Sequence, residues 1–275
     1  MNFEAWEPVY ESILSAFGYP RDGDERARDT IAAYATPFDL DRLDAAGDTV
    51  AVVGAAPSLS EEVDRVGDAD LVFAASTAAD VVRDAGFAVD LLVTDLDKNP
   101  ETAHELTEAG TPVAAHAHGD NVPLIEAWLP RLDPAHTLAT TQASPVDAVY
   151  NFGGFTDGDR AAFLADALGA AELRFVGWAF DDPTVGDEKA RKLRWAERLL
   201  HLPETRRLID PAGPTVERSG APRRAPRRHV DGIGVRSTRM QIHWHRDDLR
   251  PADNRGLAAA AGVAGDGVDN GTPGA

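Results

Sequence analysis

Two aspartates at the end of an apolar run are the residues of this sequence best suited to chemistry. Residues 91–98 read Leu-Leu-Val-Thr-Asp-Leu-Asp-Lys, so Asp95 and Asp97 directly follow a hydrophobic stretch. Ligands bind at the carboxyl ends of the strands of a parallel sheet, and side chains two residues apart at a strand end can turn to the same side. Two carboxylates there suit Mg2+, which usually also holds substrate phosphates. The stretch therefore predicts the metal site of a phosphate-transfer protein.

The Asp-x-Asp pattern carries no weight by itself in this chain. Aspartate is so abundant, at 31 of 275 residues, that chance alone yields roughly three or four such pairs. Five pairs occur, at positions 22/24, 39/41, 68/70, 95/97 and 157/159. Only its place at the end of an expected strand distinguishes one pair from the others.

A turn of small residues, Gly54-Ala-Ala-Pro-Ser58, follows another expected strand. Such a turn before a helix presents backbone N–H groups to an anion, and Ser58 is a good N-cap with Glu61 three residues later. The turn lacks the lysine of a P-loop and the glycine pattern of a dinucleotide fingerprint. An ordinary strand-to-helix turn is equally compatible with it.

The segment His116-Ala-His-Gly-Asp-Asn121 ends a further strand, whose alternation aims His116 and His118 to the same side. A His-x-His pair can bind zinc or iron. The other histidines, however, mostly lie in helical or C-terminal segments. We therefore expect His118, Asp120 and Asn121 to contact substrate or phosphate.

Two later segments complete the set. In Gly153-Gly-Phe-Thr-Asp-Gly-Asp-Arg160, either Thr156 or Asp157 is expected to cap the next helix. The chain has only three lysines, and two of them, Lys189 and Lys192, lie three residues apart on one expected helix. This placement suggests compact charges that contact a phosphate, although two surface lysines would produce the same pattern.

The composition limits the classes of function. A net charge of -19 suggests a salt-rich cytosol, in which carboxylates keep the surface hydrated, and it makes nucleic acid and anionic membranes poor partners for the acidic core. No apolar stretch approaches the roughly 20 residues of a membrane span, and the N-terminus does not resemble a signal peptide. We therefore expect a cytoplasmic protein, and a homo-oligomer is compatible with this expectation. The absence of cysteine excludes thiolate catalysis and zinc–thiolate sites.

Strands and helices alternate in the central part of the chain, which predicts an α/β fold with a mostly parallel sheet and helices on both faces. The expected strands are residues 49–55, 71–75, 91–94, 112–118, 137–141, 149–155 and 173–178. Helices are expected over residues 77–85, from residue 99, and over residues 122–129, 158–168 and 188–200.

Three regions are predicted along the chain. Residues 3–17 and 24–34 have helical spacing of apolar residues, so residues 1–45 are expected to form an N-terminal helical cap. Residues 46–203 are expected to form the α/β catalytic domain. Residues 204–275 are rich in Arg, Pro and Gly without periodicity, and we expect them to be disordered.

These segments together resemble the archaeal 6-hydroxymethyl-7,8-dihydropterin pyrophosphokinase family, whose core is similar to thiamine pyrophosphokinase. The resemblance implies a Rossmann-like three-layer sandwich, with ATP and Mg2+ as cosubstrates and a pterin alcohol as acceptor. Ala55-Ala56 depart from it, because a glycine is expected before the proline. The matching stretches are residues 53–59, 93–97, 116–121, 154–161, 177–182, Lys189 and 192–196.

The resemblance also implies roles for individual residues. The pterin hydroxyl attacks the β-phosphorus of ATP, and Asp95 and Asp97 bind Mg2+. Asp157 or Asp159 holds a second metal or orients the hydroxyl. The phosphates are contacted by Gly54, Pro57, Ser58, Arg160, Lys189 and Lys192. The candidates for reading the pterin ring are Asp120, Asn121, Asp181 and Asp182.

Three rival functions remain open on the sequence. Thiamine pyrophosphokinase performs the same chemistry on a different acceptor. A metal-dependent glycosyltransferase also uses Asp-x-Asp to hold a diphosphate. A nucleotide-binding regulatory module would bind ATP without catalysis.

Overall fold

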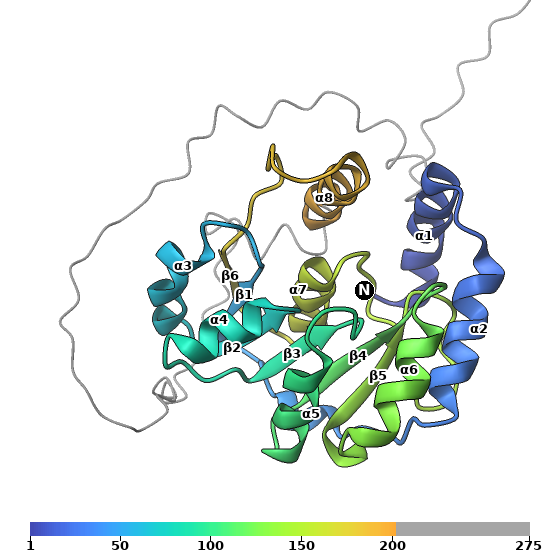
Figure 1. Cartoon of the computed structure of the whole chain (residues 1–275), viewed down its shortest axis with the longest axis horizontal. Helices are drawn as coiled ribbons and strands as arrows, with labels where there is room; N and C mark the ends of the chain where they lie inside the picture. Colours follow the sequence, from blue (N-terminus) through green and yellow to red (C-terminus); the bar gives the residue numbers. More distant parts are fainter. Residues whose placement is uncertain (202–275) are drawn as a thin grey trace, which may run out of the picture.

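One parallel sheet of six strands forms the centre of the protein in the computed structural model, which describes residues 1–201 (Figure 1). The strand order is β5-β4-β3-β2-β1-β6, which confirms the predicted α/β class. The strands are β1 (Thr49–Val53), β2 (Leu71–Ala75), β3 (Leu91–Thr94), β4 (Val113–Ala117), β5 (Thr137–Thr141) and β6 (Glu172–Val176). The predictions made for residues 204–275 lie outside the described residues.

The sheet is buried on both faces because its strands are nearly continuous apolar runs, as expected of parallel strands covered by helices. Alternate residues of β1 show this: Ala51 and Val53 belong to one apolar cluster, and Val50 and Val52 to the other. The chain adds β1 to β5 in order across the sheet and then places β6 beside β1. All six strands point the same way, so their carboxyl ends share one edge.

The helices form layers on both faces of this sheet (Figure 1). Residues of α2, α4, α5 and α6 join the apolar cluster on one face, and α7 packs on the other face. Helix α1 packs against α7 and α8 through an aromatic cluster that includes Trp6 and Phe163. The α-helices are α1 (Phe3–Phe17), α2 (Arg21–Ala32), α3 (Leu59–Glu62), α4 (Ala78–Asp84), α5 (Pro100–Glu108), α6 (Val122–Trp128), α7 (Asp157–Ala167) and α8 (Asp187–Leu200). None of the helices within residues 1–201 combines the length and apolarity that a membrane crossing requires.

Two local predictions were wrong. Residues 149–155 do not form a strand but make only isolated bridges, Thr140 to Tyr150 and Val146 to Val149. The chain then turns through Gly153 and Gly154, whose φ angles are 88° and 95°, and these angles are incompatible with a strand. Ser58 is also not a side-chain cap, because it has helical backbone angles and makes no capping hydrogen bond.

The carboxylate of Asp24 anchors the N-terminal helices to the sheet edge through hydrogen bonds. One of its oxygens accepts hydrogen bonds from the Tyr10 hydroxyl (2.7 Å) and the Gln142 amide (2.8 Å), and the other accepts from the N–H of Gly119 (2.8 Å). Asp24 is buried, with 4% of its surface exposed. The backbone of α2 comes close at this point, because a Cβ added to Gly23 would lie 3.3 Å from the Cα of Gly119. The division between a helical cap and a catalytic domain remains a prediction.

Replacing Asp24 is expected to destabilise the fold. Asp24→Ala leaves three donors without their acceptor, two of them on the buried side chains of Tyr10 and Gln142, and we expect the free energy of unfolding to fall by about 3 kcal/mol or more. Asp22→Ala is the matched control, because Asp22 lies two residues away in an exposed ion pair with Arg26 and should change stability by less than about 0.5 kcal/mol. Urea unfolding measures both, and equal stability of the two variants would contradict the role given to Asp24.

Candidate active site

Polar side chains from β3, β4 and the start of α7 meet at the carboxyl edge of the sheet. Asp95 follows β3, His118 follows β4, and Asp157 is the first residue of α7. Their charges influence one another, and Asp97 and Arg160 take part in the same electrostatic network. The structure thus brings together residues from segments that the sequence analysis considered separately.

The loop that carries the two aspartates is anchored by the residue between them. Leu96 is completely buried in the core and has a φ of 66°, a left-handed conformation that is costly for a leucine. Its neighbours are held by hydrogen bonds: the N–H of Asp97 donates to a carboxylate oxygen of Asp95 (3.2 Å), and the Asn121 amide donates to the backbone carbonyl of Asp95 (3.0 Å). The two carboxylates therefore lie in a fixed loop at the sheet edge.

His118 bridges two carboxylates. Its Nδ1 lies 2.6 Å from Asp120, and its Nε2 lies 3.3 Å from Asp95. Burial lowers the pKa of His118, but the hydrogen bonds to Asp120 and Asp95 outweigh this effect and raise it to about 9. The ring is therefore a cation at neutral pH, and it donates a hydrogen bond from each nitrogen.

The carboxylates of the site repel one another. Burial raises the pKa of Asp97 to about 6, aided by the hydrogen bond and the charge of Asp95. Burial likewise raises the pKa of Asp157 to about 7, and Asp95 is the largest charge acting in the same direction. For Asp95 itself, burial opposes ionisation, but hydrogen bonds from His118 and Asp97 hold its pKa well below the usual range.

This acidic group fits a divalent cation. Among residues 1–201 there is no preassembled cluster of three or more metal ligands. Mg2+ does not need one, because it is usually bound through one or two carboxylates while waters and substrate phosphates complete its shell. Asp95 and Asp97 provide that pair, and a cation between them would relieve the repulsion that raises the pKa of Asp97.

Asp159 and Arg160 have partners of their own. The carboxylate of Asp159 accepts hydrogen bonds from the backbone N–H groups of Phe155 and Thr156 and forms a capping box with Thr156. The expected cap at Thr156 is thus confirmed. The guanidinium of Arg160, only 7% exposed, contacts Asp157 (3.1 Å) and the Gln142 side chain (3.2 Å).

The two lysines of α8 differ in their surroundings. Lys192 lies 3.5 Å from Glu188 and 5.9 Å from the centre of the Tyr19 ring. Lys189 has an exposed surface, yet the atoms around it partly desolvate its ammonium group. This desolvation lowers the pKa of Lys189, and the charge of Lys98 lowers it further. The charge of Asp157 acts in the opposite direction. The charge of Lys189 therefore interacts with Asp157 and Asp159 of α7, whereas the charge of Lys192 acts on Asp120.

The turn at residues 54–58 packs against the end of β6. The N–H of Gly54 donates to the carbonyl of Val176 and that of Ala56 to the carbonyl of Gly177, both at 2.9 Å. A Cβ on Gly54 would lie 2.8 Å from the carbonyl oxygen of Gly177. Two of the N–H groups expected to bind phosphate are therefore used inside the protein. The contact roles predicted for Gly54, Pro57 and Ser58 remain untested.

Sequence reasoning missed Asp24 and Gln142, which connect the N-terminal helices to the site. Gln142 binds Asp24 through its amide nitrogen and Arg160 through its amide oxygen. The sequence offers only a weak signal for this link, because Asp24 belongs to one of five Asp-x-Asp pairs and Gln142 to no motif. Their partners lie far away along the chain, which is why pattern analysis does not reveal them.

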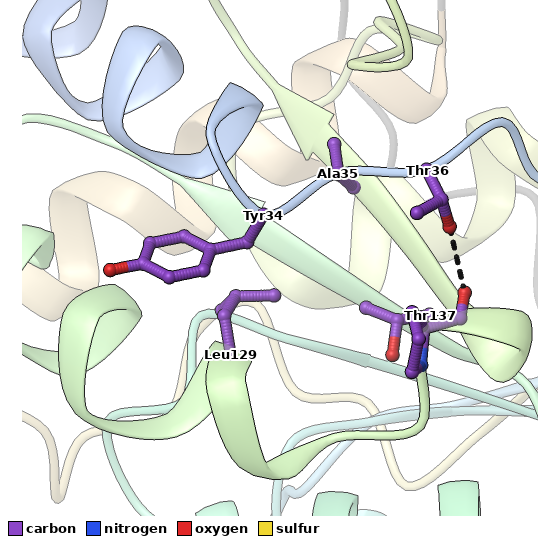
Figure 2. A pocket seen from close by; sticks show the side chains of 7 residues that line it. Tyr34, Ala35, Thr36, Leu129 and Thr137 are labelled. Atoms are coloured by element: carbon purple, nitrogen blue, oxygen red, sulfur yellow. Dashed lines mark hydrogen bonds between the residues drawn. The ribbon is translucent and has the colours of Figure 1, made fainter.

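A different pocket lies at the opposite end of β5 (Figure 2). It is lined by Tyr34, Leu129 and Thr137, and the hydroxyl of Thr36 donates to the carbonyl of Pro134 (3.1 Å) beside it. No acidic residue, histidine or lysine lines this pocket. It therefore lacks the groups that phosphate transfer requires.

The fold and the strand-end residues define an α/β protein with an acidic, partly buried site at the carboxyl edge of a parallel sheet. The model of the "6-hydroxymethylpterin diphosphokinase MptE-like" family matches residues 30–184. The chain belongs to this family, which confirms the resemblance seen in the sequence. The match includes the strand-end segments from β1 to β6.

Curated archaeal relatives carry the name 6-hydroxymethyl-7,8-dihydropterin pyrophosphokinase. The relative from Methanothermobacter thermautotrophicus is 34% identical over 220 residues, which cover 73% of this chain and 94% of the relative. That from Pyrococcus furiosus is 35% identical over 222 residues, with 73% and 93% covered. That from Methanocaldococcus jannaschii is 28% identical over 229 residues, with 73% and 95% covered.

The bridge made by His118 predicts an unusual titration. In metal-free protein, the NMR signals of the His118 ring should titrate with a midpoint near 9, and Asp120→Asn should lower it because the variant loses the strongest stabilising hydrogen bond. The folded-state pKa lies above the ordinary value of about 6.5. The contribution to stability is therefore complete below about pH 6.5 and is lost as the pH rises through about 9. A midpoint near 6.5 in the wild type would show that the bridge does not form.

Proposed function

We propose that this protein transfers a diphosphate from ATP, with Mg2+, to 6-hydroxymethyl-7,8-dihydropterin. The names of its relatives support the diphosphate transfer and the pterin acceptor. The observation that carries the proposal is the fixed pair of coupled carboxylates, Asp95 and Asp97, at the end of β3 in a member of this family. Asp95 and Asp97 would hold the Mg2+. A bound Mg2+ supplies charge neutralisation on the phosphate oxygens.

Asp157 is suited to receive the proton of the pterin hydroxyl. The hydroxyl oxygen forms a bond to the β-phosphorus of ATP, while the bond from this phosphorus to the bridging oxygen of the α-phosphate breaks and AMP leaves. The proton of the hydroxyl passes to Asp157, whose pKa of about 7 is close to the working pH, as general base catalysis favours. Arg160, 3.1 Å from Asp157, keeps this carboxylate in place.

Positive charge for the phosphates comes from histidine and lysine side chains. His118 is a cation held between Asp120 and Asp95, and Lys189 interacts electrostatically with Asp157. Phosphoryl-type transfer depends mainly on positioning and on neutralising charge. In a chain of net charge -19, such local cations are necessary for ATP to approach. We leave Asp159 out of this site because its carboxylate caps α7.

The first test identifies the acceptor. Purified protein with Mg2+-ATP should form AMP in the presence of the pterin alcohol and not with thiamine, and the product should be the pterin diphosphate by mass spectrometry. Chelation with EDTA should stop AMP formation, and excess Mg2+ should restore it. AMP formation with thiamine alone, or turnover of a nucleotide sugar without ATP, would overturn the proposal. ATP binding without any turnover would favour the regulatory module.

The second test addresses the two aspartates. Asp95→Asn and Asp97→Asn should each lower kcat at least about 100-fold, because each removes a charge that stabilises the transition state through the metal. Asp41→Asn is the matched control, since Asp41 belongs to an exposed Asp-x-Asp pair in the segment before β1 and should retain activity within about twofold. Near-normal turnover of Asp95→Asn and Asp97→Asn would remove both from the site.

A further inference from the structure

The side chain of Gln142 lies between the N-terminal helices and the start of α7. It directly follows β5 and is buried, with 5% of its surface exposed. Its amide nitrogen donates to the carboxylate of Asp24 in α2 (2.8 Å), and its amide oxygen accepts from the guanidinium of Arg160 in α7 (3.2 Å). A single amide group thus contacts an acidic group on one side and a cationic group on the other.

An amide matches the chemistry of these two partners. A carboxylate can only accept hydrogen bonds, and a guanidinium can only donate them. Glutamine carries a donor and an acceptor on one planar group, so it joins Asp24 to Arg160 without adding a buried charge. The opposite orientation of the amide would place oxygen against oxygen and nitrogen against nitrogen. The two partners therefore fix the orientation of the Gln142 amide.

The backbone of Gln142 is held from the other N-terminal helix. The indole N–H of Trp6, in α1, donates to the carbonyl of Gln142 (3.0 Å). Trp6 is completely buried in the aromatic cluster that joins α1 to α7 and α8. The N–H of the next residue, Ala143, donates to the hydroxyl of Thr141 (3.1 Å). Gln142 is therefore fixed by its backbone from α1 and by its side chain from α2.

Arg160 transmits this constraint to Asp157. One terminal nitrogen of its guanidinium donates to Asp157 and the other donates to Gln142. The Nε of Arg160 has no hydrogen-bond partner among residues 1–201. Because the guanidinium is planar and rigid, the contact with Gln142 limits where the nitrogen facing Asp157 can lie. Without Gln142, only Asp157 itself would orient the group by hydrogen bonding.

We propose that Gln142 is a positioning residue for the diphosphate transfer, because it holds Arg160 in the orientation that keeps Asp157 ready to accept the proton of the pterin hydroxyl. The inference rests on the proposed function for the role of Asp157. Gln142 acts through Arg160 and contacts neither substrate. Through the contacts of Gln142, the helices α1 and α2 contribute to catalysis as well as to stability.

A side chain of similar length without hydrogen-bonding groups tests this role. Gln142→Met removes both the donor and the acceptor. We expect kcat to fall about tenfold, since a small misplacement of a reacting group can cost up to about 100-fold in rate. The KM values for ATP and for the pterin should stay within about twofold, because the variant loses no contact with either ligand. A higher KM with an unchanged kcat would contradict a positioning role.

Tyr10→Phe is the matched control for a loss of stability. The hydroxyl of Tyr10 donates to the same oxygen of Asp24 that accepts from the Gln142 amide, and Tyr10 is also buried. Urea unfolding should show that both variants are less stable than the wild type. Tyr10→Phe should nevertheless keep kcat within about twofold, because Arg160 retains its partner. Equal losses of kcat in the two variants would reduce Gln142 to a structural role.

A double variant tests whether Gln142 acts through Arg160. Arg160→Met removes the group that connects Gln142 to Asp157. When Gln142→Met is added to Arg160→Met, kcat should fall by less than about twofold further, because residues that act in one chain are not additive. Two independent, multiplying losses of kcat would overturn the proposed route.

A measurement without turnover separates this inference from the proposed function. In ¹⁵N NMR spectra, the guanidinium of Arg160 should rotate slowly about its Cζ–N bonds while Gln142 and Asp157 both hold it. The rotation should be at least about fivefold faster in Gln142→Met, which lacks one of the two hydrogen bonds. Tyr10→Phe should leave the rotation rate unchanged.

The outcomes are distinct. If AMP forms with the pterin but Gln142→Met keeps the kcat of the wild type, the function stands and the positioning role is overturned. If no AMP forms, the proposed function fails, and the rotation rate decides whether Gln142 positions Arg160. Faster rotation in Gln142→Met then supports the assignment, and unchanged rotation overturns it as well.

Discussion

The buried carboxylate of Asp24 is the interaction on which the arrangement of the site depends. It binds Tyr10 of α1, Gly119 of the loop after β4, and Gln142 after β5. The amide oxygen of Gln142 accepts a hydrogen bond from Arg160, and Arg160 also donates to Asp157. Buried polar groups must be satisfied, so the N-terminal helices cannot move without breaking a hydrogen-bonded chain that ends at a proposed catalytic residue.

The second property of the site is that several carboxylates lie close together. Asp95 and Asp97 come from the loop after β3 and Asp157 from α7, and burial together with mutual repulsion raises the pKa of Asp97 and Asp157. His118 offsets this repulsion locally as a half-buried cation between Asp120 and Asp95. The arrangement is costly in isolation. It fits the proposed function, in which a cation and an anionic substrate would complete the site together.

The sequence by itself determined the layers and the parallel strands, because apolar periodicity is a local property that can be read along the chain. It also singled out Asp95, Asp97 and Asp157 as candidate site residues from their positions after expected strands. The sequence pattern wrongly predicted a strand at residues 149–155, because the positive φ angles of Gly153 and Gly154 turn the chain there. The tertiary structure alone decided that Asp159 caps a helix and that Asp24 and Gln142 support the site. The cap at Asp159 is local, but the contacts of Asp24 and Gln142 join residues distant in sequence, and such contacts are set only by what the folded chain brings together.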